Sequence, residues 1–558
     1  MKTASLVTAS LVTALCAVLA ATPAPLQARP AAGLKPAAAP PRLIVAISVD
    51  QFSADLFAEY RQLFRFGMKR LTEGAVFPSG YQSHAATETC PGHSTILTGL
   101  HPARTGIIAN DWIDQSVARK DKIVYCSEDP TAPGSSSENY VVSPGLLKAQ
   151  TLGDRLKIAT PASRVVSVAG KDRAAIMMGG HATDQIWYWG GKAFVTLADR
   201  TAPPPAIVTS VNARVAGLIA KPPKALLPAE CRGRSVAVPI GPDKAVGVLA
   251  DRKAEDFKGF RAAADFDAAT ADIAIGLLRD MRLGQGAATD VLAIGLSATD
   301  YVGHAFGVEG GEMCSQLMAL DATVGRILTA LDASGAPYAV VLTADHGGHD
   351  LPERNDARAF ESAQRVDPKL NAKEIGKAVA VELGLAADVP VLYATGPFGD
   401  WYLARDLPAG LRVRALALAR AKLLAHAQVA AVLTADELAR MPSPRPPVEE
   451  WSLAERARAS FDPTRSGDLI VLLKPWVTPI ADPNRGYVAT HGSPWSYDRR
   501  VPILFYRPGM TGFEQPLGVE TVDIMPTLAA LIGLKLPADE IDGRCLDLDA
   551  GPAGTCPR

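Results

Sequence analysis

Three apolar stretches rich in valine and isoleucine constrain the fold of this chain most strongly. They are residues 43–49, 291–296 and 338–342. Continuous apolar runs of this length are typical of strands buried on both faces of a parallel sheet. A helical stretch, 314–331, separates the second run from the third. This order of strand, helix and strand predicts an α/β fold with a mostly parallel central sheet flanked by helices.

An acidic residue follows each of these predicted strands. Because ligands of an open parallel sheet bind beyond the carboxyl ends of its strands, we expect these carboxylates to share one edge. Aspartate also ends many strands simply as a turn residue, so one such position decides nothing by itself. Histidines accompany the aspartates, which makes six side chains candidate metal ligands. They are Asp50, Asp300, His304, Asp345, His346 and His491.

The types and spacing of these ligands indicate the metal. Asp300 and His304 are four residues apart, so on a helical turn they share a face and can hold one ion. The set offers oxygen and nitrogen but no sulfur, and imidazole favours Zn²⁺, or a neighbour such as Co²⁺ or Mn²⁺, over Mg²⁺. Six ligands divide into two triplets that each leave a position open for catalysis. We expect two Zn²⁺ ions, and an additional Ca²⁺ remains open.

The stretch 87–94, Thr-Glu-Thr-Cys-Pro-Gly-His-Ser, contains the candidate nucleophile, Thr89. A threonine hydroxyl needs a base or a metal ion before it can attack. We expect a helix over 93–99, with Thr89 just before it, near the positive end that favours an anionic oxygen. His93 is expected to orient this loop and not to bind metal.

Three further polar residues are candidates for binding a phosphoryl group. Lys171 and Arg173 follow a predicted strand, 165–169, and two cations can neutralise a dianion. Asn110 could donate one hydrogen bond to a phosphoryl oxygen. The alternative is that all three are ordinary turn residues in contact with solvent.

The composition limits the classes of function. The chain has 558 residues, a formal net charge of -1 and 48 % hydrophobic residues. It can bury a large core, and the balanced charge argues against nucleic-acid binding as a primary role. Lys2 precedes a short apolar run, 6–20, which predicts a signal peptide over 1–28 and a periplasmic or extracellular protein. No later stretch is apolar for long enough to span a membrane.

Six cysteines remain after removal of the signal peptide, and an even number in an exported protein indicates disulfides. Sequence order suggests the pairs Cys90–Cys126, Cys231–Cys314 and Cys545–Cys556, although six cysteines allow fifteen pairings. The remaining domain layout follows from composition. We expect a disordered linker at 29–41, one catalytic domain at 42–546 with insertions at about 183–260 and 370–480, and a tail at 547–558.

Several motifs resemble the alkaline phosphatase superfamily, and more narrowly its nucleotide pyrophosphatase/phosphodiesterase-like branch. They are Asp50 after a strand, Thr89 in Thr-Cys-Pro-Gly-His, Asp300-x-x-x-His304, Asp345-His346-Gly and His491-Gly. The resemblance implies an alkaline-phosphatase-like fold and one Zn²⁺ held by Asp50, Thr89, Asp345 and His346. It implies a second Zn²⁺ held by Asp300, His304 and His491. It also implies that Asn110, Lys171 and Arg173 hold the phosphate, and that the lysine and arginine mark monoesterases within this branch.

The function implied is an exported, monomeric alkaline phosphatase that hydrolyses small phosphate monoesters through a phosphothreonine at Thr89. A phosphodiesterase or nucleotide pyrophosphatase on the same scaffold is the nearest alternative. A sulfatase is disfavoured because Pro91 directly follows Cys90, whereas the sulfatase motif needs another residue between them. A cofactor-independent phosphoglycerate mutase shares the scaffold of this superfamily but would not normally be exported. A zinc-binding protein without catalysis would not need Thr89 and its two cations.

Overall fold

The computed structural model describes residues 39–242, 244–358, 362–484, 486–550 and 554–557. The expected signal peptide, 1–28, and most of the expected linker, 29–41, lie outside the described residues. Within the described ranges, no helix has the length and apolar character needed to cross a membrane.

Ten strands of the described chain form a central sheet in the order β19-β2-β18-β11-β1-β10-β5-β6-β7, with β20 also paired to β2. Their bounds are β1 (Leu43–Val49), β2 (Ala75–Tyr81), β5 (Val165–Ala169), β6 (Gln185–Trp189), β7 (Phe194–Val195), β10 (Asp290–Leu296), β11 (Tyr338–Thr343), β18 (Arg500–Tyr506), β19 (Phe513–Glu514) and β20 (Val519–Glu520). The neighbours β11, β1, β10, β5 and β6 all run parallel, which confirms the predicted mostly parallel sheet.

One edge of this sheet collects loops from both parallel and antiparallel strands. The residues that follow β1, β5, β10 and β11 include Asp50, Lys171, Asp300 and Asp345. Because β18 is antiparallel to β11, the loop before β18, which carries His491, reaches the same edge. β2 is antiparallel to β18 and so parallel to β11, and Thr89 follows its carboxyl end. The topology therefore brings residues from position 50 to position 491 to one place.

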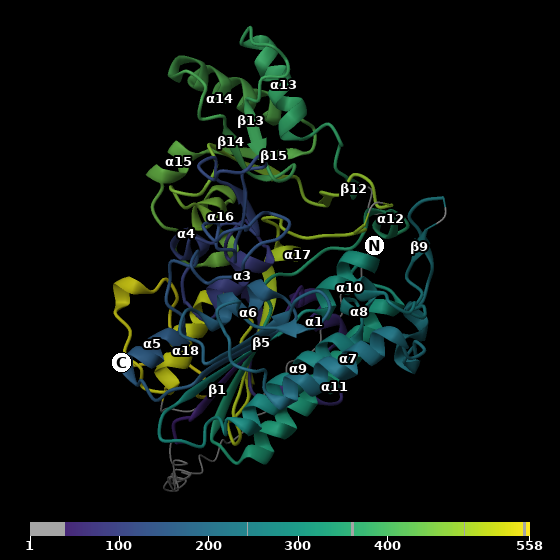
Figure 1. The fold of residues 1–558 in the computed structure, drawn as a ribbon, viewed down its shortest axis with the longest axis vertical. Helices are drawn as coiled ribbons and strands as arrows, with labels where there is room; N and C mark the ends of the chain where they lie inside the picture. The colour runs from purple at the N-terminus through teal and green to yellow at the C-terminus, as the bar shows by residue number, and fades with distance from the viewer. Residues whose placement is uncertain (1–38, 243, 359–361, 485, 551–553, 558) are drawn as a thin grey trace, which may run out of the picture. The chain divides into compact units, whose positions relative to one another are not determined.

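The two faces of β1 bury different sets of helices. Leu43, Val45 and Ile47 pack with residues of α1, α9 and α11, whereas Ile44 and Ala46 pack with residues of α3, α5 and α18. This alternation follows from the two-residue period of a strand. Figure 1 shows α9 and α11 on one side of β1 and β5, and α5 and α18 on the other. A sheet covered on both faces explains why the predicted strands are apolar throughout.

The α-helices of the described residues have the following bounds. They are α1 (Ala54–Tyr60), α2 (Gly67–Leu71), α3 (Thr89–Ile96), α4 (Pro102–Thr105), α5 (Leu152–Ala159), α6 (Asp172–Gly179), α7 (Ala206–Ala220), α8 (Phe257–Arg261), α9 (Ala264–Asp280), α10 (Ala298–Phe306), α11 (Gly311–Ser334), α12 (Pro352–Asp356), α13 (Ala372–Glu382), α14 (Ala409–Leu424), α15 (Ala435–Arg440), α16 (Leu453–Ser460), α17 (Ser496–Arg499) and α18 (Ile524–Leu531).

The two stretches predicted as insertions differ in how they relate to the central sheet. Residues 183–260 supply β6 and β7 to the central sheet, together with α7 and the pair β8 (Val238–Pro239) and β9 (Ala245–Val246). Residues 370–480 form an antiparallel sheet in the order β13-β14-β16-β15, and its core includes residues of α13 and α14. The strands are β13 (Leu392–Ala394), β14 (Gly399–Leu403), β15 (Val429–Thr434) and β16 (Leu469–Leu473). Two further small pairs are β3 (Asp111–Ile113) with β4 (Ile123–Tyr125), and β12 (Gln364–Arg365) with β17 (Val477–Thr478).

One helix prediction was wrong in its bounds, and one helical stretch is divided. Residues 53–73 form two helices, α1 and α2, because buried Asp321 accepts hydrogen bonds from the backbone N–H groups of Arg65, Phe66 and Met68 and starts a new helix there. The helix expected over 93–99 begins earlier, at Thr89. Pro91 fits because a proline in the first turn removes no helical hydrogen bond.

The three predicted disulfides, Cys90–Cys126, Cys231–Cys314 and Cys545–Cys556, are all present. The first fixes the residue beside Thr89 to the end of β4, so it ties the start of α3 to the β3–β4 hairpin. The second joins the 183–260 stretch to α11.

A buried ion-pair cluster at His101 makes the stability of the fold depend on pH. Its Nε2 lies 3.0 Å from Glu520 Oε1 and its Nδ1 lies 3.3 Å from Asp542 Oδ2. Burial alone would lower the pKa of His101, but the two carboxylates raise it to about 10. Because this exceeds the unfolded value of about 6.5, the stabilisation is fully present below about pH 6.5. It is lost as the pH rises through about 10.

We expect His101→Gln to lower the free energy of unfolding by about 3 kcal/mol at pH 6 and by much less above pH 10. Urea unfolding at both pH values measures this difference. His426→Gln, which removes a more exposed histidine 3.5 Å from Asp367, is the control and should have little effect. An equal loss for His101→Gln at both pH values would contradict the proposed ion pairs.

Candidate active site

The edge of the central sheet brings together all ten residues that the sequence indicated. They are Asp50, Thr89, Asn110, Lys171, Arg173, Asp300, His304, Asp345, His346 and His491. Seven of them are candidate metal ligands, and every one of those seven is buried. These residues lie far apart along the chain, and they become neighbours only when the sheet has folded.

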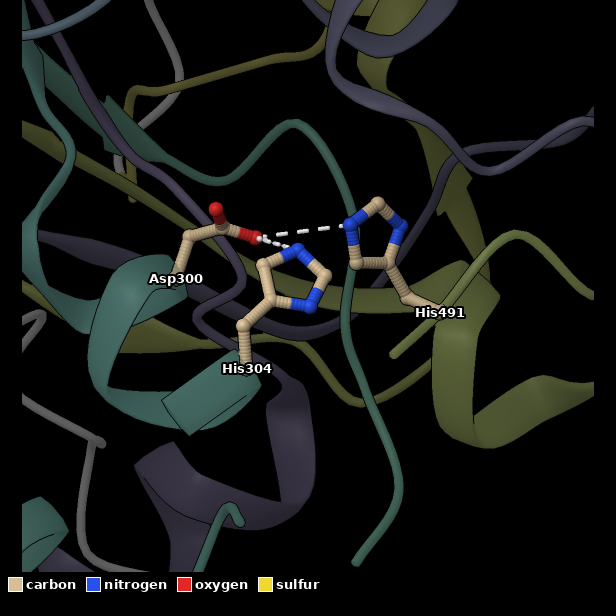
Figure 2. Close-up of side chains that lie close together, drawn as sticks. All are labelled: Asp300, His304 and His491. Carbon is tan, nitrogen blue, oxygen red and sulfur yellow. Dashed lines mark ion pairs between the residues drawn. The ribbon is translucent and has the colours of Figure 1, made fainter. Parts of the chain in front are cut away.

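One carboxylate and two imidazoles form the first ligand group. Asp300 Oδ1 lies 3.3 Å from His304 Nε2 and 3.4 Å from His491 Nε2. Figure 2 shows both rings turned toward this oxygen, with Asp300 and His304 on α10 and His491 on the loop before β18. The predicted four-residue spacing on a helical turn is therefore observed. One ligand atom from each residue lies within 4.8 Å of the others, which fits a shared cation.

The second group surrounds His346. Its Nε2 lies 3.5 Å from Asp50 Oδ1 and 3.3 Å from Asp345 Oδ2. Asp300 also lies within 4.8 Å of ligand atoms of Asp50 and His346, so this carboxylate stands between the two groups. Asp345 is held in place by the backbone N–H groups of Gln51 and His346, which both donate to its Oδ1.

The three histidines are oriented in the same way. Each Nδ1 lies 2.9 Å from a backbone carbonyl, that of Ala489 for His304, Gly347 for His346 and Thr87 for His491. A carbonyl can only accept, so each Nδ1 carries a proton, and in the neutral ring Nε2 is the nitrogen whose lone pair can bind a metal on the side of the carboxylates. Backbone partners of this kind fix the ring and its tautomer at metal sites.

Several buried polar atoms here lack a well-formed hydrogen bond. They are Oδ1 of Asp50, Oδ1 of Asp300, Oδ2 of Asp345 and Nε2 of His346. Buried groups without partners are costly unless a ligand satisfies them. Carboxylate oxygens and imidazole nitrogens with no thiolate are a donor set that suits Zn²⁺ and similar divalent ions. The residues present therefore fit a divalent metal cofactor.

The electrostatics of the site follow from burying three carboxylates together. Burial, with the charges of Asp300 and Asp345, raises the pKa of Asp50 well above its usual value. Burial would also raise the pKa of Asp300, but His304 and Lys171 hold it well below its usual value. Burial lowers the pKa of His346 to about 3, so its ring is neutral, the form that binds metal.

Thr89 is fully buried at the first position of α3, and its hydroxyl faces two cations. Its Oγ1 lies 3.3 Å from Lys171 Nζ and 3.5 Å from Arg173 Nη2. The amino end of a helix also favours negative charge. His93 contacts the carbonyl of Thr89 and Asp345 Oδ2 through its Nδ1, so it orients the loop as expected.

Lys171 links the proposed nucleophile to both ligand groups. Its Nζ lies 2.8 Å from Asp50 Oδ2 and 2.5 Å from Asp300 Oδ2. Burial would lower the pKa of Lys171, but these two carboxylates raise it, so the ammonium stays charged. Lys171 and Arg173 place two cations against the three carboxylates, so negative charge is left in the site, and a further cation would neutralise it.

Sequence patterns missed the residues that position Asn110. Glu88 accepts a hydrogen bond from the backbone N–H of Asn110 at 2.7 Å, and Asn110 Oδ1 accepts one from Cys90 N–H at 2.9 Å. Because its Oδ1 is engaged by Cys90, the side chain of Asn110 is fixed beside Thr89. Glu88 stands directly before Thr89, but an acidic residue before a helix is too common to indicate this role.

Comparison with known proteins identifies the family. The family model described as type I phosphodiesterase / nucleotide pyrophosphatase matches residues 44–494. The chain belongs to this family. Alkaline phosphatase PhoD of Zymomonas mobilis is 57 % identical over 92 % of the chain and 89 % of that protein. Alkaline phosphatase PhoK of a Sphingomonas species is 56 % identical over 93 % of both.

A solved structure shows the same fold over most of the chain. The crystal structure of alkaline phosphatase PafA matches with a TM-score of 0.78 and 26 % identity, over 91 % of this chain and 99 % of that one. A PafA variant, 25 % identical, matches equally well. It carries substitutions at a threonine, an asparagine, a lysine and an arginine, in that order along its chain.

Proposed function

We propose that this protein is a metal-dependent alkaline phosphatase that hydrolyses phosphate monoesters. The observation that carries the proposal is the hydroxyl of Thr89, which has Lys171 and Arg173 within 3.5 Å, beside two groups of buried metal-ligand side chains. The alkaline phosphatases among the relatives support it. So does the PafA variant, whose four substituted residue types occur in the same order as Thr89, Asn110, Lys171 and Arg173.

Two divalent cations, for which we propose Zn²⁺, would be held by the two ligand groups. Asp50, Thr89, Asp345 and His346 are proposed for one ion, and Asp300, His304 and His491 for the other. When bound, such ions supply Lewis-acid stabilisation of the negative charge that develops on the attacking and leaving oxygens. The sequence leaves an additional Ca²⁺ open.

The chain's own residues bind the ester and form the new bond. Lys171, Arg173 and Asn110 are proposed to hold the non-bridging oxygens, which carry most of the charge in a phosphoryl transfer. The deprotonated Thr89 oxygen attacks phosphorus, the bond to the ester oxygen breaks, and a phosphothreonine forms. The leaving oxygen takes up a proton in place of the one that Thr89 gave to solvent, so the alcohol is released. Water then attacks the same phosphorus, which releases phosphate and restores the hydroxyl. The helix end at Thr89 favours the anionic oxygen in both steps.

Arg173 offers the clearest test of monoester specificity. A monoester carries one more negative charge than a diester, so we expect Arg173→Ala to lower kcat/KM at least about 100-fold for a phosphomonoester and no more than about 10-fold for a phosphodiester. Both chromogenic esters are assayed at equal concentration. Arg155→Ala, which removes a cation paired with Glu540 away from the site, is the control. A wild-type protein that prefers the diester would support the phosphodiesterase alternative.

The layout and location of the protein are further parts of this proposal. We propose residues 42–546 as the catalytic domain, with insertions at about 183–260 and 370–480 and a tail at 547–558. The predicted signal peptide and the disulfides favour a periplasmic or extracellular enzyme, and we propose that it is monomeric and acts on small phosphate esters. Size-exclusion chromatography of the exported protein tests the oligomeric state.

A further inference from the structure

Arg173 has a side chain long enough to adopt many conformations, so something must hold its charge toward the substrate. The structure shows a chain of contacts that restrains the guanidinium. Arg173 Nη1 donates to the hydroxyl of Tyr125 at 3.2 Å, and that hydroxyl donates to Asp172 Oδ1 at 2.8 Å. Asp172 Oδ1 also accepts the backbone N–H of Arg173 at 2.8 Å.

We propose that Tyr125 is a positioning residue that aims Arg173 at the phosphoryl group and thereby sets the preference for dianionic monoesters. This inference rests on the proposed function, since it deepens the role given there to Arg173. Tyr125 lies behind the guanidinium and is not a catalytic residue, because its hydroxyl is engaged by Arg173 and Asp172.

The contacts of the guanidinium show which of its edges is left for substrate. The hydroxyl of Tyr125 accepts a hydrogen bond from Nη1, while Nη2 points to Thr89 Oγ1 at 3.5 Å. Nε is buried and has no hydrogen-bond partner among the described residues. Nε–H and Nη2–H are the parallel pair of donors with which arginine binds two oxygens of a phosphate. Holding Nη1 from behind therefore presents this pair to the phosphoryl group beside Thr89.

Tyr125 can act as a fixed support because the β3–β4 hairpin is anchored to the site. It is the last residue of β4 and is paired with Asp111 of β3. The next residue, Cys126, donates its backbone N–H to the carbonyl of Asn110 at 2.9 Å and is disulfide-bonded to Cys90. The hairpin thus carries Asn110 before one strand and Tyr125 at the end of the other, and both are tied to the residue after Thr89.

The hydroxyl of Tyr125 is suited to remain a donor in alkaline solution. The side chain is buried, and its ring packs on Tyr140 with centroids 4.3 Å apart. Burial raises the pKa of Tyr125 well above its usual value. An exposed tyrosine would begin to ionise near pH 10 and would then repel Asp172 instead of donating to it.

Tyr125→Phe tests the inference because it removes one oxygen and keeps the ring. We expect kcat/KM for a phosphomonoester to fall about 10-fold or more, with less than about a 3-fold change for a phosphodiester. Inhibition by inorganic phosphate should weaken in parallel, while zinc content and melting temperature stay close to those of the wild type. Tyr402→Phe is the matched control, since it removes a buried hydroxyl that donates to the carbonyl of Arg465 at 2.8 Å.

A double-mutant cycle separates positioning from a general structural effect. If Tyr125 acts through Arg173, Tyr125→Phe should cause no further loss in an Arg173→Ala background. Equal losses for both esters, or additive losses with Arg173→Ala, would overturn the inference. Asp172→Asn weakens the hydrogen bond that the Tyr125 hydroxyl donates to Asp172, so it should lower monoester activity more than diester activity. This variant tests the inference if Tyr125→Phe does not fold. A wild type without monoester turnover would instead refute the proposed function.

Discussion

Thr89→Ala is expected to abolish phosphomonoester hydrolysis, with a fall in kcat of at least about 10⁴-fold. The substitution removes the oxygen that lies 3.3 Å from Lys171 Nζ and 3.5 Å from Arg173 Nη2. Lys171 and Arg173 remain to bind phosphate, so inhibition by inorganic phosphate should persist while turnover is lost. Thr89→Ser, which keeps the hydroxyl, should retain a substantial part of the activity. Steady-state kinetics and phosphate inhibition of both variants measure these effects.

Trapping the intermediate gives a second measurement of the same role. Acid quenching of the wild-type enzyme during turnover should yield a phosphorylated peptide that contains Thr89, and Thr89→Ala should yield none. Thr98→Ala is the matched control. The Thr98 hydroxyl is also buried, but it donates a hydrogen bond to the backbone carbonyl of Ser94 near the end of α3. Full activity of Thr89→Ala would exclude this residue as the nucleophile.

Removal of the metal ions is expected to have the second large effect. A chelator should lower kcat/KM by at least about 10³-fold, and added Zn²⁺ should restore it. The melting temperature should also fall, because buried Asp50, Asp300 and Asp345 would lose the cations that offset their charge. Activity assays and thermal unfolding before and after chelation measure both effects.

His304→Ala distinguishes two metal ions from one. We expect the purified variant to bind one Zn²⁺ in place of two and to lose about 10³-fold in kcat/KM, since His304 serves only the group with Asp300 and His491. Elemental analysis gives the metal content per chain. His181→Ala is the control, because that half-exposed ring pairs with Asp154 outside both groups. An unchanged metal content in His304→Ala would contradict its role as a ligand.

The central fold could be predicted from sequence because its strands are buried on both faces. The stretches 43–49, 291–296 and 338–342 correspond closely to β1, β10 and β11, since parallel strands covered by helices must be apolar throughout. The break between α1 and α2 could not be predicted in this way. It depends on Asp321, a carboxylate more than 200 residues further along the chain that caps the second helix.

Some residues of the candidate site could also be predicted from sequence, and others could not. Asp300 and His304 could be found because a local helical spacing brings them together, and Asp345 and His346 because they follow a strand. Tyr125 carries no such signal, since it ends a three-residue strand and reaches Arg173 only through the folded hairpin. Residues that support the site from behind are recognised by contacts, and a single sequence does not reveal contacts.

The wide separation of the ligands along the chain has a consequence for biosynthesis. A polypeptide emerging from the ribosome presents Asp50 early, but the imidazole of His491 appears only after most of the molecule has been made. β1 must also await β10 and β11, its partners on either side, before the sheet edge exists. A chain that ends before His491 therefore lacks one of the proposed metal ligands, and we expect it to be inactive.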